Sequence, residues 1–173
     1  MKIGFCGTMS VGKTTLVKAL KELPKFKDYT FRTERSKYLM EMGIPLNTDS
    51  TLKGQLVFAA ERASELLTDN IITDRTVIDV MAFSALSKSM MAAESYFLNA
   101  TLANLVHDYD HLFYVSPVGV KIEDNGVRTT DSKYRDQINQ KIIDILDNNS
   151  VKFTTLQGST KERINKIEET ILL

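Results

Sequence analysis

The 173-residue chain is poor in the features that mark secreted and membrane proteins. It contains one cysteine, Cys6, so it cannot form an internal disulfide, and a reducing compartment is expected. Its N-terminus lacks the apolar core of a signal peptide, and no run of about 18 apolar residues could span a bilayer. We therefore expect a soluble, cytoplasmic protein with no membrane partner, in which Cys6 is a small buried hydrophobic residue.

Net charge is also absent, because 22 Lys and Arg residues balance 22 Asp and Glu residues. No global field would drive binding to nucleic acid or to an anionic membrane, although a local basic groove would still allow it. The three prolines and eight glycines are scattered, so the chain shows no linker, low-complexity tract or repeat. The sequence predicts one domain over residues 1–173, with a single core.

Short apolar segments alternate with segments of helical periodicity. Strands are predicted at residues 2–6, 29–32, 71–73, 112–115 and 151–156. This alternation predicts an α/β fold, a five-stranded parallel sheet with helices on both faces and with ligands at the carboxyl ends of the strands. Two predicted helices, 77–86 and 94–105, are apolar enough either to belong to the core or to form a homodimer interface.

The most specific motif follows the first predicted strand. The octet from Gly7 to Thr14, GTMSVGKT, fits the phosphate-binding pattern G-x-x-x-x-G-K-[ST] between a strand and a helix. In such a loop, backbone N–H groups and the helix N-terminus bind phosphate. Lys13 would reach the β- and γ-phosphates of ATP, and the Thr14 hydroxyl would ligate Mg²⁺. The predicted nucleotide-binding residues are Gly7, Thr8, Met9, Ser10, Val11, Gly12, Lys13, Thr14 and Thr15.

Charged residues follow the second and third predicted strands. After the second strand come Glu34 and Arg35, where Glu34 is either a general base for an acceptor hydroxyl or a helix-start residue favoured by the helix dipole. After the third come Asp74 and Arg75. Asp74 could hold Mg²⁺ and Arg75 could neutralise a transferring phosphate. The alternative is an N-cap Asp with a solvated Arg.

A polar segment, residues 123–133, precedes the helix that begins near Tyr134, and it carries the turn signal Asn125-Gly126. This composition predicts a lid loop. Its closure would exclude water and bring Arg128 onto the phosphates, with Lys133 or Arg135 behind it. The alternative is a solvated loop without function.

With these residues the chain resembles the nucleoside and nucleotide kinase-like branch of P-loop proteins, especially the small AAA-type ATPase and kinase group related to the ribosylnicotinamide kinase domain. The resemblance covers nearly the full length. It implies that Glu34 is the catalytic base and that Arg75 assists it. It also implies that Gln55, on the helix before the third strand, contacts a nucleobase, whereas spacing alone allows an exposed or core-edge Gln equally well.

The predicted function is ATP- and Mg²⁺-dependent transfer of the γ-phosphoryl group to a hydroxyl of a nucleoside, nucleotide or ribosylnicotinamide-like acceptor. The predicted catalytic residues are Lys13, Glu34, Arg75 and Arg128. The predicted acceptor-binding residues are Glu34, Arg35, Gln55, Asp74 and Arg75, and the predicted metal ligands are Thr14 and Asp74. Two alternatives remain: a kinase acting on a hydroxyl of modified DNA, which the neutral charge disfavours, and an ATP-binding sensing module with slow hydrolysis.

Overall fold

A computed structural model describes residues 1–33, 35–122 and 131–172 of the chain. Five parallel strands form one sheet in the order β2-β3-β1-β4-β5. The strands are β1 (Lys2–Cys6), β2 (Thr30–Arg32), β3 (Ile71–Asp74), β4 (His111–Val115) and β5 (Thr154–Leu156). This confirms the predicted α/β class and the five-stranded parallel sheet.

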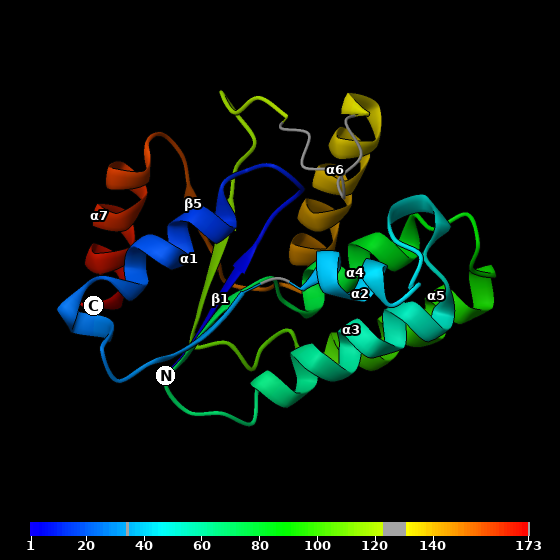
Figure 1. The fold of residues 1–173 in the computed structure, drawn as a ribbon, viewed down its shortest axis with the longest axis horizontal. Coiled ribbons are helices and arrows are strands. Elements are labelled where there is room, and N and C mark those ends of the chain that lie inside the picture. The colour runs from blue at the N-terminus through cyan, green and yellow to red at the C-terminus, as the bar shows by residue number, and fades with distance from the viewer. Residues whose placement is uncertain (34, 123–130, 173) are drawn as a thin grey trace.

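Helices cover both faces of the sheet, also as predicted (Figure 1). The α-helices are α1 (Lys13–Lys21), α2 (Ser36–Glu41), α3 (Leu52–Glu65), α4 (Val77–Ala85), α5 (Ala92–Leu102), α6 (Ser132–Asn148) and α7 (Thr160–Ile171). Short 3₁₀ segments lie at Pro24–Phe26, Asn47–Asp49 and Ala103–Leu105. Helices α1 and α7 lie on one side of the sheet, and α3, α4, α5 and α6 lie on the other. Within the described residues, no helix is both long and apolar enough to cross a membrane.

Side chains along β1 point alternately to the two faces of the sheet, so the core has two layers. Ile3 and Phe5 are buried on the side of α1 and α7, where Phe5 stacks on Phe113 with ring centroids 5.3 Å apart. Cys6 is fully buried in the opposite layer, under α4 and α6. Burial raises the pKa of its thiol well above the usual value. The prediction that Cys6 is a buried hydrophobic residue is therefore confirmed.

The ends of the strands differ slightly from the prediction. β3 includes Asp74, which lies opposite Phe5 in the β1–β3 register. β5 begins at Thr154 and not at Val151, because the Val151 N–H donates to the Leu146 carbonyl (2.9 Å) and closes the end of α6. This helix-ending contact takes the Val151 N–H away from the sheet.

The sheet order changes direction at β1, which lies between β3 and β4. In open α/β sheets the crevice beside such a switch point collects ligands at the carboxyl ends of the strands. The segment after β1 leads into α1, and the segment after β3 leads into α4. The loop from Gly7 to Gly12 and the pair Asp74-Arg75 therefore lie at the same edge.

Candidate functional site

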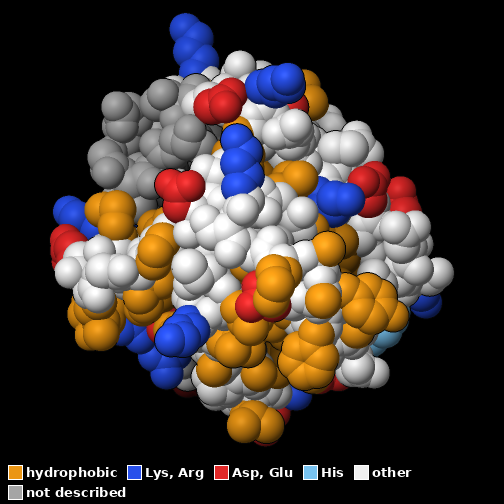
Figure 2. Space-filling model, turned by 90° about the vertical axis from the view of Figure 1, so that its right-hand side faces the viewer, with side chains coloured by type: hydrophobic (Ala, Val, Ile, Leu, Met, Phe, Trp, Pro, Cys, Tyr) orange, Lys and Arg blue, Asp and Glu red, His pale blue; other side chains and the backbone are white. Residues whose placement is uncertain are grey.

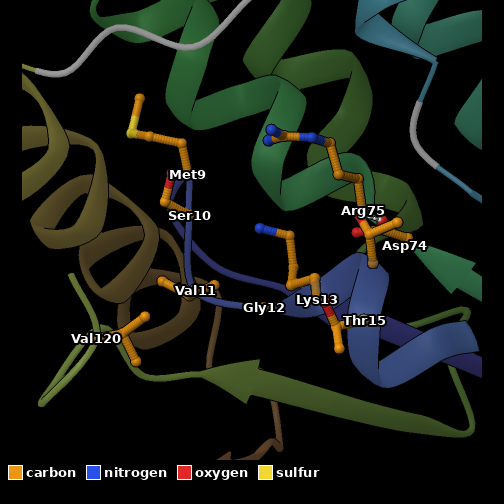
Figure 3. A pocket seen from close by; sticks show the side chains of 10 residues that line it. Met9, Ser10, Val11, Gly12, Lys13, Thr15, Asp74, Arg75 and Val120 are labelled. Carbon is orange, nitrogen blue, oxygen red and sulfur yellow. Dashed lines mark hydrogen bonds between the residues drawn. The ribbon is translucent and has the colours of Figure 1, made fainter. Parts of the chain in front are cut away.

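A pocket of about 120 Å³ opens at the carboxyl ends of β1 and β3 (Figure 3). Its lining residues are Met9, Ser10, Val11, Gly12, Lys13, Thr14, Thr15, Asp74, Arg75 and Val120. The structure thus brings Asp74 and Arg75 beside the predicted loop. Of the nine residues predicted to bind nucleotide, Met9 to Thr15 line the pocket, whereas Gly7 and Thr8 are buried behind it.

Two glycines give the loop its shape. Gly7 has a φ of +150°, and a Cβ atom there would lie 2.7 Å from the Val115 carbonyl oxygen, so the loop packs too closely on β4 for any side chain. Gly12 adopts the left-handed region (φ +85°) at the N-cap of α1. Because the N-cap residue is a glycine, it has no side chain to cap this helix end, and the first N–H groups of the helix can bind a ligand.

The Lys13 side chain folds over the loop and is only 6% exposed. Its ammonium donates to the carbonyl oxygens of Gly7 (2.5 Å) and Thr8 (2.8 Å). Figure 3 shows the Lys13 ammonium and the Arg75 guanidinium pointing into the same space, one from the start of α1 and the other from the end of β3. Two cations therefore lie beside an open helix N-terminus, which is an arrangement that favours an anion.

Two buried arginines hold the outer carbonyl groups of the loop. Arg135 on α6 donates from Nε to the Met9 carbonyl (3.2 Å) and from Nη1 to the Val120 carbonyl (2.8 Å). Arg163 on α7 donates from Nη1 to the Val11 carbonyl (2.6 Å). Desolvation by burial lowers the pKa of both guanidinium groups. Because each carbonyl is held on the outside, the loop N–H groups can face inward.

The sequence had suggested that Arg135 lies behind Arg128 and reaches the phosphates. The structure places the Arg135 guanidinium on two carbonyl oxygens instead. No local pattern singled out Arg163, which follows the capping residue Ser159 on an ordinary amphipathic helix. These two loop-holding residues are visible only after the chain has folded.

Thr14 and Asp74 bring two oxygen ligands together at the pocket. The Thr14 hydroxyl donates to the Asp74 carboxylate, and Asp74 is buried at the end of β3. Mg²⁺ prefers such hard oxygen ligands and usually keeps one or two protein ligands, with phosphate and water completing its shell. The donor set therefore fits the predicted Mg²⁺ site, and the described residues contain no cluster of three or more His, Cys, Asp and Glu side chains that could hold a metal.

Arg75 combines a strained backbone with a confined side chain. Its φ of +102° is unusual for a residue with a Cβ atom and costs about 1–3 kcal/mol. The Arg75 N–H donates to the Phe5 carbonyl (3.0 Å), which fixes the backbone to β1. The guanidinium lies 3.6 Å from the Asp79 carboxylate and 5.0 Å from the centre of the Phe83 ring. The structure thus directs Arg75 into the pocket and away from solvent.

Asp79 joins three parts of the site, although the sequence did not single it out. It is 1% exposed. One oxygen accepts the Thr76 N–H (2.9 Å) and hydroxyl (3.0 Å), which forms the capping box of α4. The other accepts the Gly7 N–H (3.3 Å) and faces Arg75. The spacing Thr76-x-x-Asp79 could have indicated the capping box, but it carried no sign of the contact with the loop.

An aromatic pair adjoins Arg75 on the side of α4 and α6. The rings of Phe83 and Tyr134 meet edge to face with centroids 6.5 Å apart. The Tyr134 hydroxyl is buried and has no hydrogen-bond partner among the described residues. Burial raises the pKa of Tyr134. This side of the site is therefore aromatic and mostly buried, with one polar group, next to a cation.

Two predicted acceptor-binding residues lie away from the pocket lining. The Arg35 guanidinium donates to Glu61 on α3 (3.0 Å) and lies 4.5 Å from the Tyr38 ring centre. Gln55 is 4% exposed in the first turns of α3. Its side-chain amide makes no hydrogen bond to another described residue. Gln55 is therefore buried, and its amide is not paired with any residue that the structure describes.

The remaining predicted residues cannot be placed. Glu34, Arg128 and the Asn125-Gly126 turn lie outside the described residues. From the predicted lid, the structure describes Asp131, which caps α6 by accepting the N–H groups of Lys133 (2.9 Å) and Tyr134 (3.2 Å). The roles of Glu34 and Arg128 stay predictions.

A phosphate-binding loop between β1 and α1 of a five-stranded parallel sheet is the arrangement of a P-loop protein. The AAA domain family matches residues 2–163, and the chain belongs to this family. No curated protein matches the sequence.

Solved structures share the fold at low identity. A deoxyadenosine kinase from M. mycoides in complex with dCMP and dCDP superposes with a TM-score of 0.65 at 16% identity, over 99% of this chain and 98% of that one. The NadR protein in complex with NR superposes with a TM-score of 0.68 at 16% identity, over 91% of this chain and 45% of that one. Thymidylate kinase from Ehrlichia chaffeensis superposes with a TM-score of 0.61 at 17% identity, over 99% of this chain and 96% of that one. At these identities the similarity shows a common fold.

Proposed function

We propose that the protein is an ATP- and Mg²⁺-dependent kinase that transfers the γ-phosphoryl group to a hydroxyl of a nucleoside, nucleotide or ribosylnicotinamide-like acceptor. The observation that carries this proposal is the convergence of Lys13, the Thr14–Asp74 pair and Arg75 on one pocket. Phosphoryl transfer is catalysed mainly by positioning and by stabilising negative charge. The pocket supplies cations and inward-facing N–H groups for both tasks.

The donor side of the reaction follows from the loop. The N–H groups of the loop and of the start of α1 would hold the β-phosphate, and Lys13 would bridge the β- and γ-phosphates. Thr14 and Asp74 would hold Mg²⁺, which neutralises phosphate charge and orients the oxygen atoms. Arg75, fixed by Asp79 beside the loop, would lie against the transferring group. A cytoplasmic location, where ATP is abundant, belongs to the same proposal.

The acceptor side is supported by chemistry and by the names of the similar structures. The Phe83–Tyr134 pair places aromatic side chains next to Arg75, and the amide of Gln55, which has no hydrogen-bond partner among the described residues, could hydrogen-bond a base or amide edge. The similar structures include a deoxyadenosine kinase, a thymidylate kinase and a protein bound to NR, which favours a nucleoside-like acceptor. We keep Glu34 as the proposed general base, Arg128 as the proposed phosphate ligand, and Arg35 as a residue near the acceptor.

Steady-state kinetics of two variants with matched controls test the proposal. Lys13→Ala should abolish transfer, whereas Lys18→Ala, an exposed position on the same helix, should leave it unchanged. Glu34→Gln should lower kcat by roughly 10²–10⁴-fold with little change in the KM for ATP, because a general base acts in the chemical step. Glu41→Gln, which makes the same change at an exposed position of α2, is the control for Glu34→Gln. Full activity in either Lys13→Ala or Glu34→Gln would refute the assigned roles.

A further inference from the structure

Helices α1 and α4 both begin beside the pocket, but their first N–H groups differ in what they contact. α1 begins without a side-chain cap. At the start of α4, three consecutive N–H groups donate to the protein itself: Thr76 to the Asp79 carboxylate (2.9 Å), Val77 to the Tyr109 hydroxyl (3.1 Å) and Ile78 to the Thr76 hydroxyl (3.2 Å). The start of α4 is therefore a turn fixed by other residues, and its N–H groups are not open to a phosphate as those of α1 are.

Tyr109 holds this turn from a distant segment of the chain. It lies just before β4, and its hydroxyl reaches the first residue of α4, which is 32 positions away in the sequence. Burial raises the pKa of Tyr109, so the phenol stays neutral at physiological pH and its oxygen accepts the Val77 N–H. Tyr96 of α5 shows the opposite situation. It is 77% exposed, and Figure 2 shows hydrophobic side chains at the surface on the side of the molecule that carries α5.

The ring of Tyr109 lies against β1 at Gly4. A Cβ atom at Gly4 would lie 2.6 Å from Cδ1 of Tyr109 and 2.7 Å from Cγ2 of Thr76, so a larger residue there would have to displace both side chains. In the sheet register, Gly4 lies between Thr73 of β3 and Leu112 of β4. The missing side chain on the central strand therefore gives the Tyr109 ring a defined place between the sheet and the start of α4.

The same turn carries Arg75, whose φ of +102° must be imposed by the surrounding structure. On one side, the Arg75 N–H donates to the Phe5 carbonyl of β1 (3.0 Å). On the other side, two residues later, the Val77 N–H donates to Tyr109. With both contacts in place, the guanidinium points into the pocket beside Lys13, as Figure 3 shows. Loss of either contact would allow the strained backbone to relax and would move the guanidinium away from this position.

We propose that Tyr109 is a positioning residue for phosphoryl transfer, which acts through the start of α4 to hold Arg75 against the transferring group. The inference rests on the proposed kinase function and adds to it a residue that does not line the pocket. The loop and the start of α1 would provide most of the contacts to ATP, whereas Arg75 would face the charge that develops during transfer. Removal of the Tyr109 hydroxyl should therefore affect the transition state more than the binding of ATP.

Steady-state kinetics of Tyr109→Phe test this role, because the substitution keeps the ring and removes only the hydroxyl. Val77 is fully buried, so its N–H would lose its partner, and kcat should fall roughly tenfold while the KM for ATP changes by less than about twofold. Tyr114→Phe is the matched control. It removes another buried hydroxyl, which donates to Asn139 on α6 (2.8 Å), and it should leave kcat unchanged. In an Arg75→Ala background, Tyr109→Phe should cause no further loss of kcat, because Tyr109 acts through Arg75. A further tenfold loss in that background would overturn the proposal.

Hydrogen exchange of the backbone amides tests the same contact without an activity measurement. Tyr109→Phe should speed exchange at Arg75 and Val77 roughly tenfold or more, since both N–H groups depend on the fixed turn. Tyr96→Phe, at an exposed position, should change neither rate. Wild-type exchange rates at both amides in Tyr109→Phe would overturn the proposal. A wild type that transfers phosphate to no acceptor would refute the proposed function and the positioning role with it, whereas an active wild type with unchanged kcat in Tyr109→Phe would refute the positioning role alone.

Discussion

The substitution Asp79→Asn tests whether one buried carboxylate joins the loop, Arg75 and the start of α4. The two side chains have the same shape, so the change replaces one acceptor oxygen by an NH₂ group. The remaining oxygen can keep the Thr76 N–H and hydroxyl, which lie at 2.9 and 3.0 Å. The NH₂ group then faces the Gly7 N–H and the Arg75 guanidinium, which are themselves donors. The Asn side chain thereby places its NH₂ donor against two other donors at position 79, where the native Asp79 is 1% exposed.

The expected loss of stability follows from these contacts. A hydrogen bond to a charged group contributes about 1.5–3 kcal/mol, and an unpaired buried N–H costs about 1–3 kcal/mol. The ion pair with Arg75 is weakened as well, at 3.6 Å and with both side chains mostly buried. Because these contributions overlap, we expect the free energy of unfolding to fall by about 2–4 kcal/mol in Asp79→Asn.

Urea unfolding followed by circular dichroism measures this loss as a shift of the midpoint at constant slope. Asp147→Asn is the matched control, because Asp147 is exposed near the end of α6 and should change stability by no more than about 0.5 kcal/mol. The KM for ATP should also rise in Asp79→Asn, since the Gly7 N–H begins the loop. If both variants unfold at the same urea concentration, Asp79 does not connect these elements as described.

Three further outcomes follow from single contacts. Arg163→Met removes the donor to the Val11 carbonyl and should weaken ATP binding by roughly tenfold in calorimetry, with partial recovery in Arg163→Lys; unchanged affinity in Arg163→Met would contradict its loop-holding role. Gly7→Ala places a Cβ atom 2.7 Å from the Val115 oxygen and should lower the melting temperature by roughly 5 °C or more, so an unchanged melting curve would count against this packing. Because burial raises the pKa of Cys6, the thiol should stay protonated and unreactive toward thiol reagents at neutral pH, and added ATP should slow its modification further; rapid labelling of the native protein would disagree with its burial.

The sequence predicted the parts of the site that local patterns encode. The octet from Gly7 to Thr14 is contiguous, and its glycines and lysine dictate the loop wherever a strand precedes it and a helix follows. Asp74 and Arg75 could be predicted because the ends of neighbouring parallel strands meet at one edge of the sheet. Both predictions needed only the order of the elements.

The parts that escaped prediction are held by contacts between distant segments. Arg163 reaches Val11 across 152 positions of the chain, and Arg135 reaches Met9 across 126. An arginine in an amphipathic helix gives no sign of such a contact, because its residue type fits an exposed position equally well. Gln55 shows the same limit, since spacing alone allowed a Gln that contacts a base and an exposed or core-edge Gln equally well, and did not predict its burial.

Competition between α6 and the sheet explains why β5 begins at Thr154 and not at the predicted Val151. Val151 and Phe153 have the composition of a strand, and this favoured a start at Val151. In the folded chain, the Val151 N–H satisfies a carbonyl at the end of α6 instead of pairing with β4. Composition describes the preference of a segment, but it does not include the carbonyl groups that a preceding helix leaves unpaired.

Transfer from γ-labelled ATP with Mg²⁺ tests the central claim most directly. The acceptors should include nucleosides, nucleoside monophosphates, ribosylnicotinamide and hydroxymethylated DNA, with Lys13→Ala as the control enzyme. The account predicts a labelled nucleoside-like product in the wild type and none in Lys13→Ala. Label that appears only as free phosphate, or that remains on ATP with every acceptor, would contradict the assignment as a kinase and would favour an ATP-binding sensing module.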